Sequence, residues 1–403
     1  MTDLLSLVEM ESDDAELVPE IFPVDARLSI SARANVLQAL FASAVDVTPL
    51  KEVITNTSYV SLAGFEGRKQ IEVSATDGER AITVNGPAIV RLEGAVLLPG
   101  KRVLEILKLS PEDTVRIDVL GQTATIRSGR AVWTVQTPTT EARLPVFEAV
   151  DDAQWYPVPK AELLRALEIA LPAVSHSTAR QSLMQAELAI NYITACDGVR
   201  AHKVALPSIH ELFETTFPLK FIESAIKELR TTSYDTAYLW SNHNTVGLRL
   251  GQDKLLAQRL NFGFPAVNHL VLGPALLNEE RLTVSLADLI GTVKRVRVNA
   301  DPEYAALSLS LRKNKGDWEV VVRSRDKAGN ASQETIPAEY VGPATNKDLT
   351  VNHKYFLEFL NCLSGPEVEL RLGEATKTKQ APIFYQSDDF TGSLMVMAPN
   401  FIR

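Results

Sequence analysis

The stretch "ARLSISARANVLQALFASAV" at residues 26–45 decides the fold, because its pattern returns twice along the chain. It first alternates aliphatic and small polar residues, as a strand does, and then spaces apolar residues as an amphipathic helix does. The same change occurs in "WYPVPKAELLRALEIALPAV" at 155–174 and in "RLTVSLADLIGTVKRVRV" at 281–298. Three such stretches in 403 residues predict three repeats of about 120–130 residues.

A second helix follows in each repeat and begins at a proline or an asparagine. The three copies are "LLPGKRVLEIL" at 97–107, "FPLKFIESAIKELR" at 217–230 and "VNHKYFLEFLNCL" at 351–363, each followed by alternating β-runs. We therefore predict an α+β fold of three repeated domains, each with two helices packed on antiparallel sheets. The predicted boundaries are an acidic N-terminal tail at 1–25 and domains at 26–150, 151–271 and 272–403.

The composition is that of a soluble globular chain, with 45% hydrophobic and 23% charged residues. No apolar run reaches the roughly 18 residues of a membrane span, and the acidic N-terminus lacks the basic start of a secretory signal. The two cysteines, Cys196 and Cys362, form neither a disulfide framework nor a zinc-ligand spacing. We predict a cytoplasmic protein without membrane contact, metal or cofactor.

The net charge of −9 argues against a nucleic-acid partner until its distribution is considered. Residues 1–25 hold eight carboxylates and no lysine or arginine, so removing these eight from −9 leaves −1 for the rest of the chain. A nearly neutral body can still carry one basic surface when its charges are segregated. The charge pattern therefore leaves a nucleic-acid partner open.

The motif Asp-Gly-x-Arg occurs in the first two repeats, in "SATDGERAITV" at 74–84 and "TACDGVRAHKV" at 194–204. As an active site it would use Asp77 or Asp197 as a base, but neither a histidine nor a second carboxylate recurs beside both copies. As a tight turn it needs only glycine for positive φ and aspartate to cap the backbone. We favour the turn and predict that the protein is not an enzyme and has no catalytic residues.

The repeats and turns, together with "VLLPGKRVLEIL", "IRSGRAVWTVQT", "NFGFPAV" and the closing "SLMVMAPNFIR", resemble the bacterial DNA polymerase III β subunit, the sliding clamp. The resemblance runs from about Arg27 to the C-terminus. It implies that two chains close head to tail into a homodimeric ring around duplex DNA. Such a ring binds DNA without regard to sequence, is placed on it by a clamp loader, and tethers the replicative polymerase as a processivity factor.

The resemblance also implies a positively charged inner wall that faces the phosphates. The predicted helices carry these basic residues: Arg33, Lys101, Arg102, Lys108, Arg165, Lys220, Lys227, Arg230, Lys294, Arg295 and Lys354. The predicted DNA contacts are those that recur in the second helix of two repeats: Lys101, Arg102, Lys220 and Lys227. Solvated helix faces are the alternative for the other basic residues.

Two further DNA contacts, Lys51 and Arg180, are predicted from their place in the family pattern. The sequence departs from that pattern at both sites. Thr48 stands where the family often has an arginine, near Lys51, and Gln181 and Ser182 follow Arg180 where the family can have tyrosines.

The family's partner surface is a pocket between the second and third domains that takes short peptides from polymerases and loaders. Aliphatic walls with a few polar groups suit such a ligand; ordinary interdomain packing is the alternative. The corresponding residues here are Leu183, Cys196, Gly198, Val199, Arg200, Ala201, Pro265, His269, Leu270, Asn352, Tyr355, Val396, Met397, Ala398 and Pro399. The ending "APNFIR" differs from the family's usual one.

For the ring interface, the resemblance pairs edge strands of the first and third domains. We predict that Trp133 and Val135 of one chain lie opposite Val296 and Val298 of the other, with Trp133 as a core residue of the monomer being the alternative.

Two rival functions and one further hypothesis stay open. The first rival is a protein-interaction scaffold of the same fold that does not encircle DNA. The second is a DNA-modifying enzyme, against which the missing carboxylate cluster for metal ions counts. The hypothesis is that "TDLLSLVEM" at 2–10 of the tail resembles a clamp-binding peptide and competes for the pocket.

Overall fold

The computed structural model forms two compact units. Unit 1 holds Met1–Trp155 and Lys227–Gln258, and unit 2 holds Tyr156–Ile226 and Arg259–Arg403. The middle third of the chain therefore contributes to both units. The described residues are 23, 25–51, 54–65, 67, 69–139, 142–145, 154–209, 213–267, 279–343, 347–372 and 382–394. The predicted acidic tail lies almost entirely outside them.

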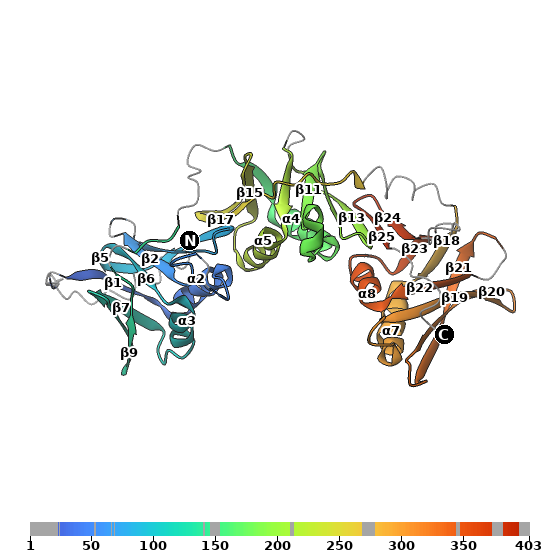
Figure 1. Ribbon diagram of the computed structural model, residues 1–403, viewed down its shortest axis with the longest axis horizontal. Helices are drawn as coiled ribbons and strands as arrows, with labels where there is room; N and C mark the ends of the chain where they lie inside the picture. Colours follow the sequence, from blue (N-terminus) through green and yellow to red (C-terminus); the bar gives the residue numbers. More distant parts are fainter. Residues whose placement is uncertain are drawn as a thin grey trace. The chain divides into compact units, whose positions relative to one another are not determined.

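Unit 1 contains two antiparallel sheets and the helices α2 and α3, which Figure 1 shows side by side. The first sheet has the order β5-β1-β7-β8-β9, and the second runs β15-β16-β17-β4-β3-β2-β6 within the unit. The elements are β1 (Ala26–Arg33), α2 (Ala34–Val47), β2 (Val60–Phe65), β3 (Gln70–Thr76), β4 (Arg80–Pro87), β5 (Ile89–Leu92), β6 (Gly94–Leu98), α3 (Gly100–Lys108), β7 (Thr114–Leu120), β8 (Thr123–Ser128), β9 (Ala131–Gln136), β15 (Thr236–Ser241), β16 (Thr245–Leu250) and β17 (Asp253–Gln258).

Unit 2 is built on one continuous antiparallel sheet of the order β14-β11-β12-β13-β25-β24-β23-β18-β21-β20-β19-β22. Its elements are β10 (Tyr156–Pro159), α4 (Lys160–Ala170), η3 (Leu171–Ala173), η4 (Thr178–Leu183), β11 (Gln185–Ala189), β12 (Tyr192–Cys196), β13 (Arg200–Ala205), β14 (Thr215–Pro218), β18 (Arg281–Ser285), α7 (Leu286–Val296), η6 (Arg297–Asn299), β19 (Ala306–Asn314), β20 (Asp317–Arg325), β21 (Ala331–Val341), β22 (Lys347–Asn352), α8 (His353–Asn361), β23 (Glu367–Leu372), β24 (Ile383–Gln386) and β25 (Phe390–Leu394). The boundary between the units falls inside α5 (Leu219–Thr231).

The two predicted strand-to-helix steps occur in every repeat. The first is β1 to α2, β10 to α4 and β18 to α7, and the second is β6 to α3, β14 to α5 and β22 to α8. The helices form because their apolar residues share one face, which packs into the core. Side-chain caps define two of the starts: Ser285 accepts from the amide of Asp288, and Asn352 accepts from that of Lys354. The predicted α+β fold with antiparallel sheets is confirmed.

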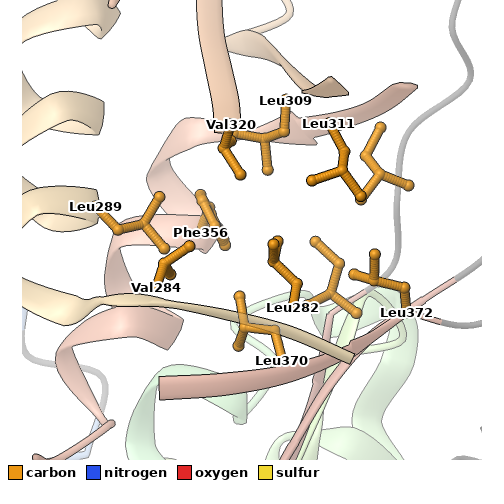
Figure 2. A pocket seen from close by; sticks show the side chains of 11 residues that line it. Leu282, Val284, Leu289, Leu309, Leu311, Val320, Phe356, Leu370 and Leu372 are labelled. Atoms are coloured by element: carbon orange, nitrogen blue, oxygen red, sulfur yellow. The ribbon is translucent and has the colours of Figure 1, made fainter. Parts of the chain in front are cut away.

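The core of the third repeat is closed and apolar. Figure 2 shows leucine, valine and phenylalanine side chains from β18, α7, β19, β20, α8 and β23 pointing toward one another around a small cavity. Phe356 of α8 is fully buried there, and Leu282 of β18 and Leu370 of β23 lie beside it. Because this lining has no polar side chain, the cavity fits a packing gap rather than a ligand site.

Candidate peptide pocket, DNA surface and chain interface

The Asp-Gly-x-Arg segment of unit 2 is a tight turn fastened by its aspartate. Oδ1 of Asp197 accepts hydrogen bonds from the amides of Val199 (2.8 Å) and Arg200 (2.9 Å), and Oδ2 accepts from Nε of Arg200 at 3.0 Å. Gly198 has φ of 88°, a conformation that L side chains rarely adopt. These bonds use the carboxylate to hold the backbone, which supports the turn interpretation of the motif.

The corresponding segment of unit 1 is the same turn. Oδ1 of Asp77 accepts from the amides of Glu79 (2.9 Å) and Arg80 (2.8 Å), and Gly78 has φ of 91°. The two arginines differ in what they reach next. Nη2 of Arg80 donates to the carbonyl of Asp46 at the end of α2, so this copy ties the turn to a helix of its own repeat.

The arginine of the second turn reaches the third repeat. The side chain of Arg200 is only 7% exposed, its Nη1 bonds to Glu358 of α8, and its guanidinium lies 4.7 Å from the ring centre of Tyr355. Two predicted pocket residues, Arg200 and Tyr355, are therefore in contact. Such a buried, paired guanidinium fixes the position of α8 beside the turn.

A small apolar cluster, called the pocket cluster from here on, lies against the turn. Cys196, Ala201 and Val267 are buried together, and Leu183 and Phe264 pack on them while staying partly exposed. Burial is the main cause that raises the pKa of the Cys196 thiol, so it stays neutral and acts as a small apolar residue. The cluster unites three predicted residues and adds two that were not predicted, Phe264 and Val267.

The polar groups of the predicted pocket mostly support the backbone. Asn352 caps α8, and its Nδ2 donates to the carbonyl of Tyr304 at 3.3 Å. Nη1 of Arg180 donates to the carbonyl of Asp197 at 2.8 Å, so this predicted DNA contact also holds the turn. Pro265 accepts from the amide of Val267 at 2.7 Å. The other predicted pocket residues lie outside the described residues: His269, Leu270, Val396, Met397, Ala398 and Pro399.

The pocket cluster lies at a strand junction within unit 2. β13 pairs with β25 so that Ala201 is opposite Ser393 and His202 is opposite Gly392. His202 is fully buried, its Nδ1 lies 2.6 Å from the carbonyl of Ile169, and Phe390 meets its ring edge-on. Burial lowers the pKa of His202 to about 4, so the junction holds a neutral imidazole.

The predicted DNA contacts Lys101, Arg102, Lys220 and Lys227 are exposed on α3 and α5. Lys51 is exposed at the end of the segment that follows α2. Lys227 forms an ion pair with Asp46, so a phosphate would have to compete with that carboxylate. Lys354, the second residue of α8, is exposed as well. It is one of the basic helix residues named from the sequence, but it was not chosen as a DNA contact, because it follows Asn-His rather than a proline.

The four predicted interface residues divide into two exposed or partly exposed and two buried ones. Val298 is 78% exposed and Trp133 is half-buried on β9, the last strand of its sheet. Val135 and Val296 are each 2% exposed. They pack in the cores of their own units, so their side chains offer no surface to a second chain.

Two absences hold for the described ranges. No group of three or more His, Cys, Asp or Glu side chains there lies close enough to bind a metal ion. No helix among the same residues combines the length and apolarity needed to cross a membrane.

Comparisons with known proteins agree with the fold. Residues 30–145 match the family described as DNA polymerase III beta subunit, N-terminal domain. The chain is 23% identical over 352 residues to the beta sliding clamp of Synechococcus elongatus, which covers 85% of this chain and 91% of that relative. The sliding clamp of Bartonella birtlesii bound to griselimycin matches with a TM-score of 0.82 at 16% identity over 92% of this chain and 99% of that one. The Bacillus subtilis clamp gives 0.80 at 16% identity over the same shares.

Proposed function

Because this chain is a distant member of the DNA polymerase III beta sliding clamp family, which has no catalytic activity, we propose that it works as a DNA sliding clamp. Two copies close into a ring around duplex DNA. The ring tethers the replicative polymerase through the pocket beside the Asp197 turn and depends on a clamp loader for assembly on DNA.

The observation that carries the proposal is a lysine at the same helical position in all three repeats. Lys101, Lys220 and Lys354, the helix-start lysines, are each the second residue of the second helix of their repeat, and each is exposed. A cation in the first turn opposes the helix dipole and costs about 0.3–1 kcal/mol. None of these helices has an acidic residue in its first turn. Helix stability therefore does not explain these lysines, whereas binding to an anionic partner such as a phosphate backbone does.

Closure of a ring by two chains is supported by the two strand junctions inside the units. β4 pairs with β17 with Ala81 opposite Leu256, and β13 pairs with β25 with Ala201 opposite Ser393. Each alanine is the residue after its turn arginine. Its partner is the fourth residue after a two-residue hairpin turn: Leu256 is the fourth residue counted from Asp253, and Ser393 is the fourth counted from Phe390. The junctions therefore share one register.

The third repeat offers the matching half of such a junction. The amide of Asp326 bonds to the carbonyl of Asn330, closing a turn one residue longer than those in which Asp77 and Asp197 bond to their arginines. Counted from this closing bond, Ala331 of β21 corresponds to the two junction alanines. β21 pairs with β20 along 331–338 and with β18 only at 339–341, so among the described strands no second strand pairs with it over 331–338. At the start of this edge Nδ2 of Asn299 donates to the carbonyl of Ala331 at 3.2 Å. On β9 the corresponding fourth residue is Thr134.

The proposed contact between chains is thus β9 of one copy on β21 of the other, with Thr134 opposite Ala331. Trp133 is then opposite Ser332, whose hydroxyl accepts from Asn299, the neighbour of the exposed Val298. An aromatic anchor beside an exposed aliphatic residue suits an interface. This register retains Trp133 and Val298 of the predicted interface.

Cross-linking tests this register. A Thr134→Cys, Ala331→Cys variant treated with a short bis-maleimide should give a covalent dimer, because paired strands hold facing Cβ atoms about 4.5–5.5 Å apart. The control Thr134→Cys, Thr335→Cys displaces one cysteine by four residues, about 13 Å along the strand. Equal cross-linking of both variants, or a monomer at all concentrations in sedimentation, contradicts the proposed closure.

A further inference from the structure

Unit 1 has a cleft of about 220 Å³ between the segment 142–145 and the strands β3, β4 and β17. Leu144, Pro145, Thr76, Ala81, Lys254 and Leu256 are among the residues that line this unit-1 cleft. Its volume exceeds the roughly 150 Å³ of a cavity that accommodates a benzene molecule. The cleft can therefore take one or two branched aliphatic side chains.

The unit-1 cleft occupies the place that the pocket cluster occupies in unit 2. It follows an Asp-Gly-x-Arg turn and lies on the junction where Ala81 faces Leu256, as the pocket cluster lies where Ala201 faces Ser393. The two sites differ in how far they are covered. Ala201 is completely buried, whereas Ala81 is half-buried, so the unit-1 cleft is the more open of the two.

Two basic residues border the unit-1 cleft. Lys254 lines it, and Arg143 belongs to the segment that covers it, which Asn56 fastens by donating to the carbonyl of Arg143 at 3.0 Å. Among the acids close to it, Glu72 accepts a 3.3 Å hydrogen bond from Ser74 of the cleft, and Asp77 and Asp253 adjoin Thr76 and Lys254 in the sequence. A ligand with aliphatic and acidic side chains would match this surface, with its acids directed at Lys254 and Arg143.

The N-terminal end of the described chain lies close to the covering segment. β1 begins at Ala26, whose amide bonds to the carbonyl of Pro23. Burial first, and then the guanidinium of Arg143, lower the pKa of the neighbouring Arg27. The two arginines are therefore near each other, and the tail joins unit 1 beside the segment that covers the cleft.

We propose that residues 4–8 of the chain's own N-terminal tail, "LLSLV", dock in the unit-1 cleft. These residues lie outside the described part of the chain, and residues 1–22 around them carry seven carboxylates and no lysine or arginine. The inference rests on the proposed function only through the likeness of the cleft to the peptide pocket. It gives the acidic tail a docking site of its own, distinct from the pocket that partner peptides occupy.

The tether makes such docking favourable even for a weak ligand. From residue 8 to the start of β1 an extended chain spans up to about 60 Å, more than the width of a domain of this size. Attachment to the same unit gives the segment an effective concentration on the order of 1 mM. A segment with an intrinsic Kd of roughly 100 μM would then occupy the cleft about ten times as often as it leaves it empty.

The test uses a labelled peptide of residues 1–22 and a chain that begins at residue 23, measured by fluorescence anisotropy. We expect saturable binding, at least tenfold weaker binding to a Leu144→Asp variant, and at least threefold weaker binding to Lys254→Glu. The full-length chain should bind the same peptide at least fivefold more weakly, because its own tail competes. An unchanged melting temperature of each variant shows that it is folded.

The matched control is Leu183→Asp, which alters the pocket cluster of unit 2 and should change the affinity for the tail peptide less than twofold. Loss of tail binding in Leu183→Asp but not in Leu144→Asp would overturn the inference, since the tail would then occupy the partner pocket. Absence of binding to the shortened chain would overturn it as well. Binding of a polymerase peptide tests the proposed function separately, because it should depend on Leu183 and not on Leu144.

Discussion

Replacing Arg200 with methionine tests whether the second Asp-Gly-x-Arg turn organises the proposed peptide pocket. The change removes the 3.0 Å bond to Asp197, the ion pair with Glu358 and the contact with the ring of Tyr355. Methionine keeps most of the side-chain volume, so the cavity term stays small. Asp197 keeps its two backbone amide donors, from Val199 and from residue 200 itself.

The expected loss follows from these three contacts. A hydrogen bond to a charged group contributes about 1.5–3 kcal/mol, an ion pair with a half-exposed partner such as Glu358 at most about 1 kcal/mol, and the ring contact about 0.5–1 kcal/mol. A total of about 3 kcal/mol should lower the melting temperature of unit 2 by about 6–12 °C, at about 2–4 °C per kcal/mol for a unit of roughly 200 residues. Differential scanning calorimetry measures this shift.

The same variant should bind a labelled polymerase peptide at least tenfold more weakly, as measured by fluorescence anisotropy, because α8 loses its fixed position beside the turn. The matched control is Arg80→Met, which alters the equivalent turn in unit 1 and should leave peptide affinity unchanged. The reasoning is refuted if Arg200→Met melts within 2 °C of the parent and binds the peptide equally well. It is refuted too if Arg80→Met weakens the peptide as much.

Three further outcomes are expected. Gly198→Ala should lower the free energy of unfolding of unit 2 by at least about 1–2 kcal/mol, because φ is 88° and the new Cβ would lie 2.2 Å from Nη1 of Arg180. Gly78→Ala should have the same effect on unit 1, where the new Cβ would lie 2.3 Å from Ile54. Thermal unfolding measures both. His202 has a pKa of about 4 in the folded chain and 6.5 ordinarily, so the unfolded chain takes up the proton at higher pH than the folded chain does. The free energy of unfolding of the parent should therefore be full above pH 6.5 and fall by up to about 3 kcal/mol on acidification to pH 4. His202→Ile should show a smaller fall, as measured by melting curves at pH 4.5 and 7.5. Replacing the helix-start lysines with alanine should reduce the slope of log binding constant against log salt by up to about 0.9 for each phosphate that these lysines neutralise, as measured by DNA titrations at several salt concentrations.

The fold could be predicted because the spacing of apolar residues within each repeat indicates its strands and helices. The change from alternating to helical spacing is visible in the sequence at each strand-to-helix step, and the structure has a helix at each of them. The division into two units was not predictable in this way. It depends on the pairing of β4 with β17 and of β13 with β25, whose members lie more than 150 residues apart in sequence. The prediction of three separate domains is untested by the division, because continuous sheets join neighbouring repeats.

The candidate site was predictable where a residue's role depends on local backbone. Asp197 and Gly198 form the expected turn because aspartate and glycine have the required chemistry in any context. Burial was harder to predict: Val135 and Val296 have the same residue type as the exposed Val298, and only packing distinguishes them. Phe264 was missed because its place in the cluster depends on long-range packing against the Cys196 strand.

The central claim is that two copies enclose DNA, and retention on circular versus linear DNA tests it most directly. The chain is loaded by its clamp loader and ATP onto a nicked circular plasmid, and half of the sample is then linearised. A ring should stay on the circle through gel filtration in 0.5 M salt, where exposed charges are screened, and leave the linear DNA by sliding off its ends. Equal retention on both forms, or equal loss from both, would contradict the account.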